Sequence, residues 1–278
     1  MEPSRNQTSD GDRTAVVVVT DQPFFYRAER TVKDIRGRGQ WTGDIVLIAV
    51  DFIPSINFIN DYKVTIYPVK HIDVSPLVET WKTFPIRPMA DQRHTKKLAQ
   101  WNKLYVFDEY FLNWDRVIYF DAGLRVVGPI KPLLDLDYKG KFIAPDDGCT
   151  NGSRFITQMD WEANPDITKD IYDTFGSDIV NAQYFMNCMW LYDTAILHTC
   201  SKNNLEEGMI KYPISLCNEM GIMNLYFSYM HKVWHPLPEK TADGKWLYAW
   251  CESNYAGRPS WENFHYLKYP VTISFNMD

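Results

Sequence analysis

The stretch "DRVIYFDAG" (Asp115–Gly123) decides the fold, because in it a buried strand runs directly into a charged turn. Four apolar residues, Val117–Phe120, precede Asp121 without a polar interruption. A continuous apolar run of this kind is typical of a strand that is buried on both faces of a sheet. A single aspartate at a strand end is often only a turn or cap residue. Asp121 therefore either ends the strand or holds a ligand such as a metal ion or a phosphate.

Four other segments have the same character as this strand. Helix-length segments, about 25–38 and 94–112, lie between some of them. Strands of this kind that alternate with helices predict an α/β fold, with a mainly parallel sheet flanked by helices. The four additional strands are expected at Ala15–Asp21, Asp44–Phe52, Tyr62–Val69 and Lys141–Asp147.

The second half of the chain is less regular. Residues 180–194 predict a strand pair or a strand that enters a helix, two helices are expected at 198–211 and 218–231, and a strand at 245–252. No linker rich in proline, glycine or serine separates the halves. We therefore expect a flexible tail at residues 1–13 and one domain at 14–278, in which 14–147 and 148–278 form two functional halves.

Composition excludes several classes of protein. The formal net charge of -6, without a basic stripe, argues against a nucleic-acid partner. A mean hydropathy of -0.34, with no apolar run near the ~20 residues that cross a bilayer, excludes a membrane span. Five cysteines without CxxC spacing fit neither a disulfide framework nor a zinc site. A cytoplasmic location is expected, and a lumenal domain of a secretory-pathway enzyme is the alternative.

Acidic residues follow several of the expected strands. Ligands of open parallel sheets bind beyond the carboxyl ends of the strands, so Asp21, Asp51, Asp121, Asp146 and Asp147 would share one rim. This cluster favours a site for a metal ion and phosphates. The chain has no GxGxxG, GxxxxGK[ST] or GxSxG motif, which disfavours dinucleotide oxidoreductases, P-loop enzymes and α/β-hydrolases.

Two segments carry a specific resemblance. The segment from Lys103 to Asp147 resembles the core of the GT-A glycosyltransferases, in particular the glycogenin-like family 8 enzymes, and "VVVVTDQPFFYRA" is similar to their first strand and turn. The resemblance implies a Rossmann-like GT-A fold and a hexosyl- or pentosyltransferase that moves a sugar from a nucleotide-sugar, most simply a UDP-sugar. It also places Thr20, Asp21 and Tyr26 near the nucleotide base. Residues 14–147 would then bind the nucleotide-sugar and residues 148–278 the acceptor.

The family's Asp-x-Asp motif is incomplete in this chain. Side chains at positions i and i+2 of a strand point the same way, so two carboxylates can hold one Mn²⁺ or Mg²⁺ ion on the donor diphosphate. Here the motif reads Asp121-Ala122-Gly123, and Gly123 offers only close approach of its backbone to a ligand. The segment "NFHYLKYP" (Asn263–Pro270) resembles the family's C-terminal motif, which makes His265 the second expected metal ligand.

Further residues receive expected roles. Lys103 and Lys268 are expected to contact phosphate, and Asp146 and Asp147 the hydroxyl groups of the acceptor or sugar. Glu219 stands where the family has the aspartate of its "DQxxlN" motif. The family implies retention of anomeric configuration, with the leaving phosphate helping to deprotonate the acceptor. An inverting route would instead need a carboxylate base, for which Asp147 and Glu219 are the candidates.

The missing second aspartate leaves alternatives open. One is a GT-A glycosyltransferase that works without a metal, in which Lys103, Lys268 or Arg125 supplies the positive charge. Another is a non-catalytic protein that binds sugar-nucleotides or glycans. A nucleotidyltransferase is a weaker alternative, because no basic glycine-rich loop follows the first strand.

Overall fold

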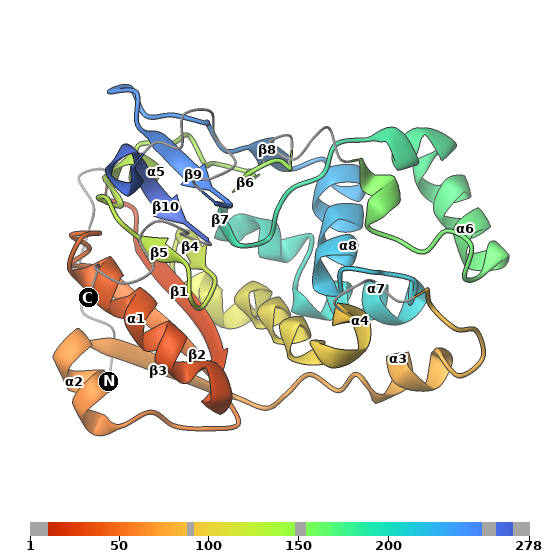
Figure 1. Ribbon diagram of the computed structural model, residues 1–278, viewed down its shortest axis with the longest axis horizontal. Coiled ribbons are helices and arrows are strands. Elements are labelled where there is room, and N and C mark those ends of the chain that lie inside the picture. Colours follow the sequence, from red (N-terminus) through yellow and green to blue (C-terminus); the bar gives the residue numbers. More distant parts are fainter. Residues whose placement is uncertain (1–10, 88–91, 148–153, 252–259, 269–278) are drawn as a thin grey trace.

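The computed structural model describes residues 11–87, 92–147, 154–251 and 260–268. Its centre is a seven-stranded sheet in which β7 alone runs antiparallel to its neighbours (Figure 1). In spatial order the strands are β3 (Val64–Val69), β2 (Asp44–Val50), β1 (Thr14–Asp21), β4 (Arg116–Phe120), β7 (Met189–Asp193), β6 (Phe142–Ala144) and β8 (Trp234–Pro236).

The order of the strands creates a switch point between β1 and β4. The chain adds β2 and β3 on one side of β1 and then returns to place β4 on the other side. The connections that leave β1 and β4 therefore diverge at the carboxyl edge of the sheet. In open α/β sheets this divergence opens the crevice in which ligands bind.

Both faces of the sheet are buried, as the apolar runs predict. In β1, Ala15, Val17 and Val19 belong to one core cluster, whereas Val16 and Val18 belong to a second cluster on the opposite face. This alternation follows from the two-residue period of a strand. It explains why a run of five apolar residues is needed here and an alternating pattern would not suffice.

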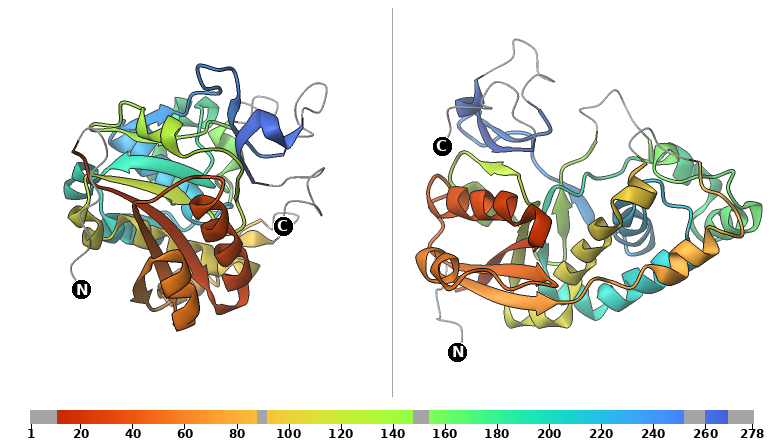
Figure 2. Two further views of the ribbon diagram at one scale, coloured as in Figure 1. Left: turned by 90° about the vertical axis from the view of Figure 1, so that its left-hand side faces the viewer. Right: turned by 60° about the horizontal axis from the view of Figure 1, so that its bottom comes forward.

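Different helices cover the two faces (Figure 2). Residues of α1 (Phe25–Arg36) and α2 (Ile56–Tyr62) pack in the cluster of Val16, and the 3₁₀ helix η2 (Leu98–Phe107) in the cluster of Val17. Further segments complete the second layer: η3 (Glu109–Asn113), α7 (Lys202–Lys211), α8 (Glu219–Asn224) and the π-helix η7 (Leu225–Met230). The remaining short helices are η1 (Gln22–Phe24), α3 (Ser75–Thr80), α4 (Arg93–Lys96), α5 (Lys131–Leu134), η4 (Phe155–Thr157), α6 (Pro165–Phe175), η5 (Ser177–Asn181), η6 (Thr194–His198) and η9 (Trp261–Asn263).

A second, three-stranded sheet brings the end of the described chain to the site. Its order is β5 (Arg125–Val126), β10 (Phe264–Leu267) and β9 (Trp246–Ala249). Because β5 begins four residues after Asp121, pairing with β10 places the residues that follow β10 close to the carboxyl end of β4. Figure 1 shows this small sheet beside β4 of the large sheet.

The fold class predicted from the sequence is confirmed, but several boundaries were wrong. The expected helix at 94–112 is divided into α4, η2 and η3, because Asp108 is extended (φ -72°, ψ 147°) and its side chain accepts a hydrogen bond from Tyr110 N. Of the segment 180–194, in which a strand pair or a strand entering a helix was expected, β7 is the part that forms a strand. The helix expected at 218–231 ends in a π-helical turn. The division into functional halves at residue 147 stays a prediction.

Candidate functional site

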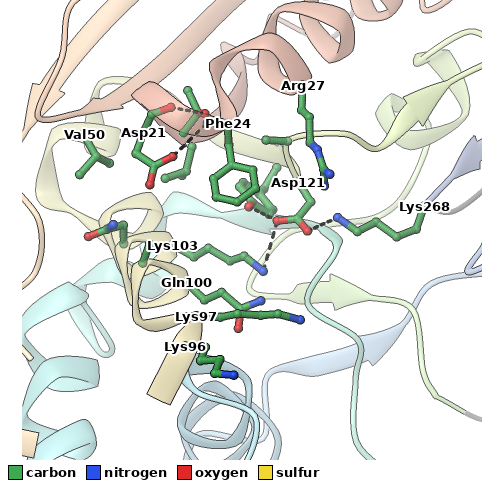
Figure 3. A pocket seen from close by; sticks show the side chains of 16 residues that line it. Asp21, Phe24, Arg27, Val50, Lys96, Lys97, Gln100, Lys103, Asp121 and Lys268 are labelled. Atoms are coloured by element: carbon green, nitrogen blue, oxygen red, sulfur yellow. Dashed lines mark hydrogen bonds and ion pairs between the residues drawn. The ribbon is translucent and has the colours of Figure 1, made fainter. Parts of the chain in front are cut away.

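A cavity of about 280 Å³ opens at the switch point, at the carboxyl ends of β1 and β4. Its lining comes from the ends of β1 and β2, from η1 and the start of α1, from the segment α4 through η2, from the end of β4, and from one residue after β10. The side chains that matter below are drawn in Figure 3: Asp21, Phe24, Arg27, Lys96, Lys97, Lys103, Asp121 and Lys268.

Asp121 lies at the centre of this cavity wall, and both oxygens of its carboxylate are engaged. Tyr119 OH donates a hydrogen bond to Oδ1 at 2.7 Å, and Lys103 Nζ lies 3.2 Å from the same oxygen. Lys268 Nζ donates to Oδ2. The two ammonium groups approach the carboxylate from opposite sides (Figure 3). Burial alone would raise the pKa of Asp121, but the two lysines outweigh it and lower the pKa to about 2.

Lys103 connects Asp121 to a second buried carboxylate. Its Nζ lies 3.0 Å from Glu219 Oε1, and the same oxygen accepts a hydrogen bond of 2.5 Å from Asn187 Nδ2. Burial by itself lowers the pKa of Lys103, but the carboxylates of Asp121 and Glu219 raise this pKa by more than burial lowers it. The lysine therefore stays charged. Burial raises the pKa of Glu219, whose side chain is 1% exposed. Lys268, Asp121, Lys103 and Glu219 thus form a chain of alternating charges, which we call the lysine–carboxylate cluster.

The mouth of the cavity is basic. Arg27, Lys96 and Lys97 are exposed and line it. The acidic residues of the described lining are Asp21 and Asp121. The lining therefore has five cationic and two anionic side chains, in a protein whose net charge is -6. Such a local excess of positive charge attracts an anionic ligand.

An exposed aromatic ring belongs to the described lining of the cavity. Phe24, at the end of η1, is 46% exposed and lines the cavity, with the Arg27 guanidinium 5.5 Å from the centre of its ring. The turn that presents Phe24 is held by Asp21, whose Oδ1 accepts a hydrogen bond from Phe24 N at 3.3 Å. An exposed ring beside a basic cavity can stack on a flat heterocycle.

The structure brings some of the predicted base-binding residues to the cavity but not all of them. Thr20 and Asp21 line it; the Thr20 hydroxyl donates to the carbonyl oxygen of Asp21 at 3.0 Å. Tyr26 is 61% exposed and does not belong to the described lining; its hydroxyl accepts from Arg27 Nε at 2.9 Å. Phe24, two residues earlier in the same aromatic run, lines the cavity, and the assignment of Tyr26 to the nucleotide base stays a prediction.

Other cavity residues were also missed. Arg27, Lys96 and Lys97 are ordinary basic residues in the sequence, where nothing distinguishes them from surface cations. Their one signal is position, since Arg27 follows β1 closely and the two lysines precede Lys103 by one to two helical turns. Without the fold, that spacing could not be recognised as one wall of a cavity.

The two candidate bases lie outside the described lining of the cavity. Asp147 follows β6, is buried, and accepts a hydrogen bond from Tyr184 OH. Glu219 lies behind Lys103, within the lysine–carboxylate cluster. Arg125, an alternative source of positive charge, is paired instead with Asp34, whose Oδ2 lies 2.6 Å from Arg125 Nε.

His265 and Lys268 face different surroundings. The His265 ring packs against Gly128, with Nδ1 3.3 Å from the carbonyl oxygen of Pro129, and burial holds the pKa of His265 below its usual value. Lys268 directly follows β10 and reaches Asp121, whereas His265, inside β10, lies against Gly128 and Pro129.

The residues around Asp121 do not fit the divalent ion that the resemblance implies. Gly123 has no side chain to offer and adopts φ +92°, with its N–H donated to Thr31 Oγ1 at 3.0 Å. His265 has other neighbours, and both oxygens of Asp121 are in contact with cations or a hydroxyl. Within the described ranges, no group of three or more His, Cys, Asp or Glu residues could hold a metal ion.

Comparisons with known proteins show similarity in structure but not in sequence. No protein-family model matches the chain, and no curated protein matches it in sequence. The galactosyltransferase LgtC, in complex with donor and acceptor sugar analogues, is 14% identical, with a TM-score of 0.59 over 92% of this chain and 86% of that chain.

Two other glycosyltransferases are similar over most of this chain. The core-mannan synthase A from Aspergillus fumigatus, in its Mn/GDP form, is 8% identical, with a TM-score of 0.52 over 84% of this chain and 75% of that chain. The bifunctional glycosyltransferase WbbM is 14% identical, with a TM-score of 0.51 over 84% of this chain and 40% of that chain. Identities this low show the fold alone, and family 8 membership stays a prediction. The chain has the mixed α/β fold of these glycosyltransferases, which confirms the resemblance to the GT-A group at the level of fold.

Proposed function

We propose that this protein is a glycosyltransferase that moves a hexose or pentose from a UDP-sugar to a hydroxyl acceptor. The observation that carries the proposal is the basic cavity at the switch point of a GT-A fold, with an exposed ring at its mouth. The exposed face of Phe24 suits a nucleobase, and the carboxyl ends of β1 and β4 are where this type of sheet binds ligands. The acceptor is assigned to residues 148–278, as the sequence predicts.

The charge of the cavity matches a nucleotide diphosphate. The diphosphate of a nucleotide-sugar carries about two negative charges at neutral pH. The lining has a net charge of +3, which becomes +2 when the buried Glu219 carboxylate behind Lys103 is included. Preorganised cations stabilise the charge that develops on a departing diphosphate, because they need no rearrangement during the reaction.

The carboxylates support retention of configuration. An inverting transferase needs a base within hydrogen-bond reach of the acceptor hydroxyl. The carboxylates of the described lining are Asp21, which holds the Phe24 turn, and Asp121, whose low pKa makes it a weak base. Asp147 and Glu219 are buried elsewhere. A route in which the leaving phosphate takes the acceptor proton requires none of them.

A panel of nucleotide-sugars tests this function. Release of UDP is measured for each UDP-sugar, thermal stabilisation is recorded in parallel, and NMR of the product gives the anomeric configuration. We expect stabilisation and turnover with at least one UDP-sugar, and a KM increased about tenfold by Lys97→Ala, the loss of one phosphate contact. Lys131→Ala is the matched control, because Lys131 is an exposed lysine paired with Asp135.

The outcomes of this panel are distinct. Stabilisation by UDP without turnover of any UDP-sugar would indicate the non-catalytic binding protein. Absence of both stabilisation and turnover would refute the assignment of the cavity to nucleotide-sugars.

The structure contains no helix, within its described ranges, that is long and apolar enough to cross a membrane. The cellular compartment stays a prediction.

A further inference from the structure

We propose that the ammonium group of Lys268, held on Asp121, takes the place of the divalent ion, so that sugar transfer by this protein does not require a metal. This inference rests on the proposed function, since it concerns how the donor diphosphate is neutralised. It starts from the disagreement described above, in which the residues expected to hold an ion do not form a ligand set.

Both oxygens of the Asp121 carboxylate are already in contact with other groups. Divalent ions lie about 2.0–2.6 Å from the carboxylate oxygens that bind them. Asp121 Oδ2 is in contact with the Lys268 ammonium, and Oδ1 with the Lys103 ammonium and the Tyr119 hydroxyl. An ion at either oxygen would have to displace an ammonium group, or remain close to it against charge repulsion. A built-in cation therefore already occupies this place.

Lys268 is a fixed part of the cavity wall. Its side chain is 8% exposed, and its backbone N–H donates to the carbonyl oxygen of Ala249 at 3.0 Å. β10 pairs with β5, which follows Asp121 by four residues, so the register of the small sheet sets the position of Lys268. A lysine held in this way acts as a preorganised cation and not as a mobile surface charge.

The charge balance of the site resembles that of a metal centre. A divalent ion held by two carboxylates forms a neutral group that nevertheless polarises a phosphate. The lysine–carboxylate cluster is neutral in the same sense, with Lys268 and Lys103 balanced by Asp121 and Glu219. The second carboxylate of the cluster is Glu219, which pairs with Lys103 behind the cavity, so the charge balance does not require an aspartate at position 123.

The first experiment measures the metal alone. Mn²⁺ is titrated into the free protein and followed by calorimetry or by the Mn²⁺ paramagnetic resonance signal. We expect no saturable binding up to about 1 mM, the weak end of protein sites for divalent ions. Saturable Mn²⁺ binding that disappears in Asp121→Asn would overturn the inference and leave the proposed function intact.

The second experiment measures UDP affinity in EDTA and in Mn²⁺. For the wild-type protein we expect dissociation constants that agree within about twofold. Lys268→Met is expected to weaken UDP binding about tenfold or more in both solutions, and Lys268→Arg to retain most of the affinity, because it keeps the charge. Lys169→Met is the control, since Lys169 forms a comparable ion pair with Asp173 on the protein surface.

The wild-type comparison does not depend on whether the variants fold. UDP binding that requires Mn²⁺ in the wild-type protein overturns the inference, as does unchanged affinity in a folded Lys268→Met. Failure of UDP to bind both in EDTA and in Mn²⁺ would instead refute the proposed function. The Mn²⁺ titration separates these two failures, because it requires no donor.

Discussion

Substitution of Asp121 by asparagine tests the structural basis of the site. The variant Asp121→Asn retains the size and one oxygen of the side chain but loses its charge. The lysine–carboxylate cluster would then contain two cations, Lys103 and Lys268, and one anion, Glu219. We expect the protein to fold with reduced stability, because an uncompensated charge is left in a largely buried place.

Two independent estimates give the size of the effect. Removal of one partner from a buried ion pair costs about 3–5 kcal/mol, and the 16% exposure of Asp121 favours the lower end. The pKa of Asp121 is lowered from 3.8 to about 2, and at about 1.4 kcal/mol per pKa unit this corresponds to roughly 2–3 kcal/mol. We therefore expect Asp121→Asn to reduce the free energy of unfolding by about 3 kcal/mol at neutral pH.

The same numbers predict how the effect depends on pH. The folded-state pKa of Asp121 lies below its unfolded value, so the folded protein binds fewer protons at this group. Its contribution to stability is complete above the unfolded value of 3.8 and is lost as the pH falls through about 2. The difference in stability between wild type and Asp121→Asn should therefore shrink between about pH 4 and pH 2.

Urea unfolding followed by tryptophan fluorescence measures this difference. Both proteins are compared at pH 7 and at successively lower pH, so that the titration of other groups cancels in the difference. Asp135→Asn is the control, because it removes a carboxylate from an exposed pair with Lys131 and should change stability by less than about 1 kcal/mol. A difference below about 1 kcal/mol for Asp121→Asn at pH 7, or one that does not vary with pH, would contradict the buried ion-pair cluster.

The cavity and its surroundings give three further predictions. Glu219→Gln should lower turnover by less than about tenfold, since Glu219 positions a lysine; a loss of about a hundredfold or more would instead identify a general base. Phe24→Ala should weaken UDP binding about tenfold by calorimetry, through loss of base stacking, whereas Tyr26→Ala should leave it nearly unchanged; the reverse order would restore the sequence-based assignment. Gly123→Ala should lower the free energy of unfolding by about 1–2 kcal/mol in urea, because alanine is strained at φ +92°, and an unchanged midpoint would argue against this backbone conformation.

Much of the fold could be predicted because its signals are local. The run Val117–Phe120 and the run Ala15–Val19 specify strands that are buried on both faces, and such strands occur in parallel sheets covered by helices. The helix expected at 94–112 failed for a non-local reason. Residues 101–107 are buried almost throughout, so no polar face marks a helical period there, and Asp108 interrupts the segment.

The site could be predicted only in part. Position in the chain was sufficient to select Thr20, Asp21 and Asp121, because residues that leave parallel strands meet at one edge of the sheet. The same reasoning could not choose between Phe24 and Tyr26. Both follow β1 in one aromatic run, and the geometry of the turn at η1 decides which ring reaches the cavity.

The sequence by itself determined that Asp121 follows a buried strand and that glycine, not a second carboxylate, stands two residues later. What stands beside Asp121 was decided by the tertiary structure. The pairing of β10 with β5 brings Lys268 to one oxygen of the carboxylate, and η2 brings Lys103 to the other. The physical reason is separation along the chain, since Lys268 lies 147 positions after Asp121 and the pairing of β10 with β5 brings the two together. Contacts between residues more than a hundred positions apart depend on register, and register is a property of the folded sheet.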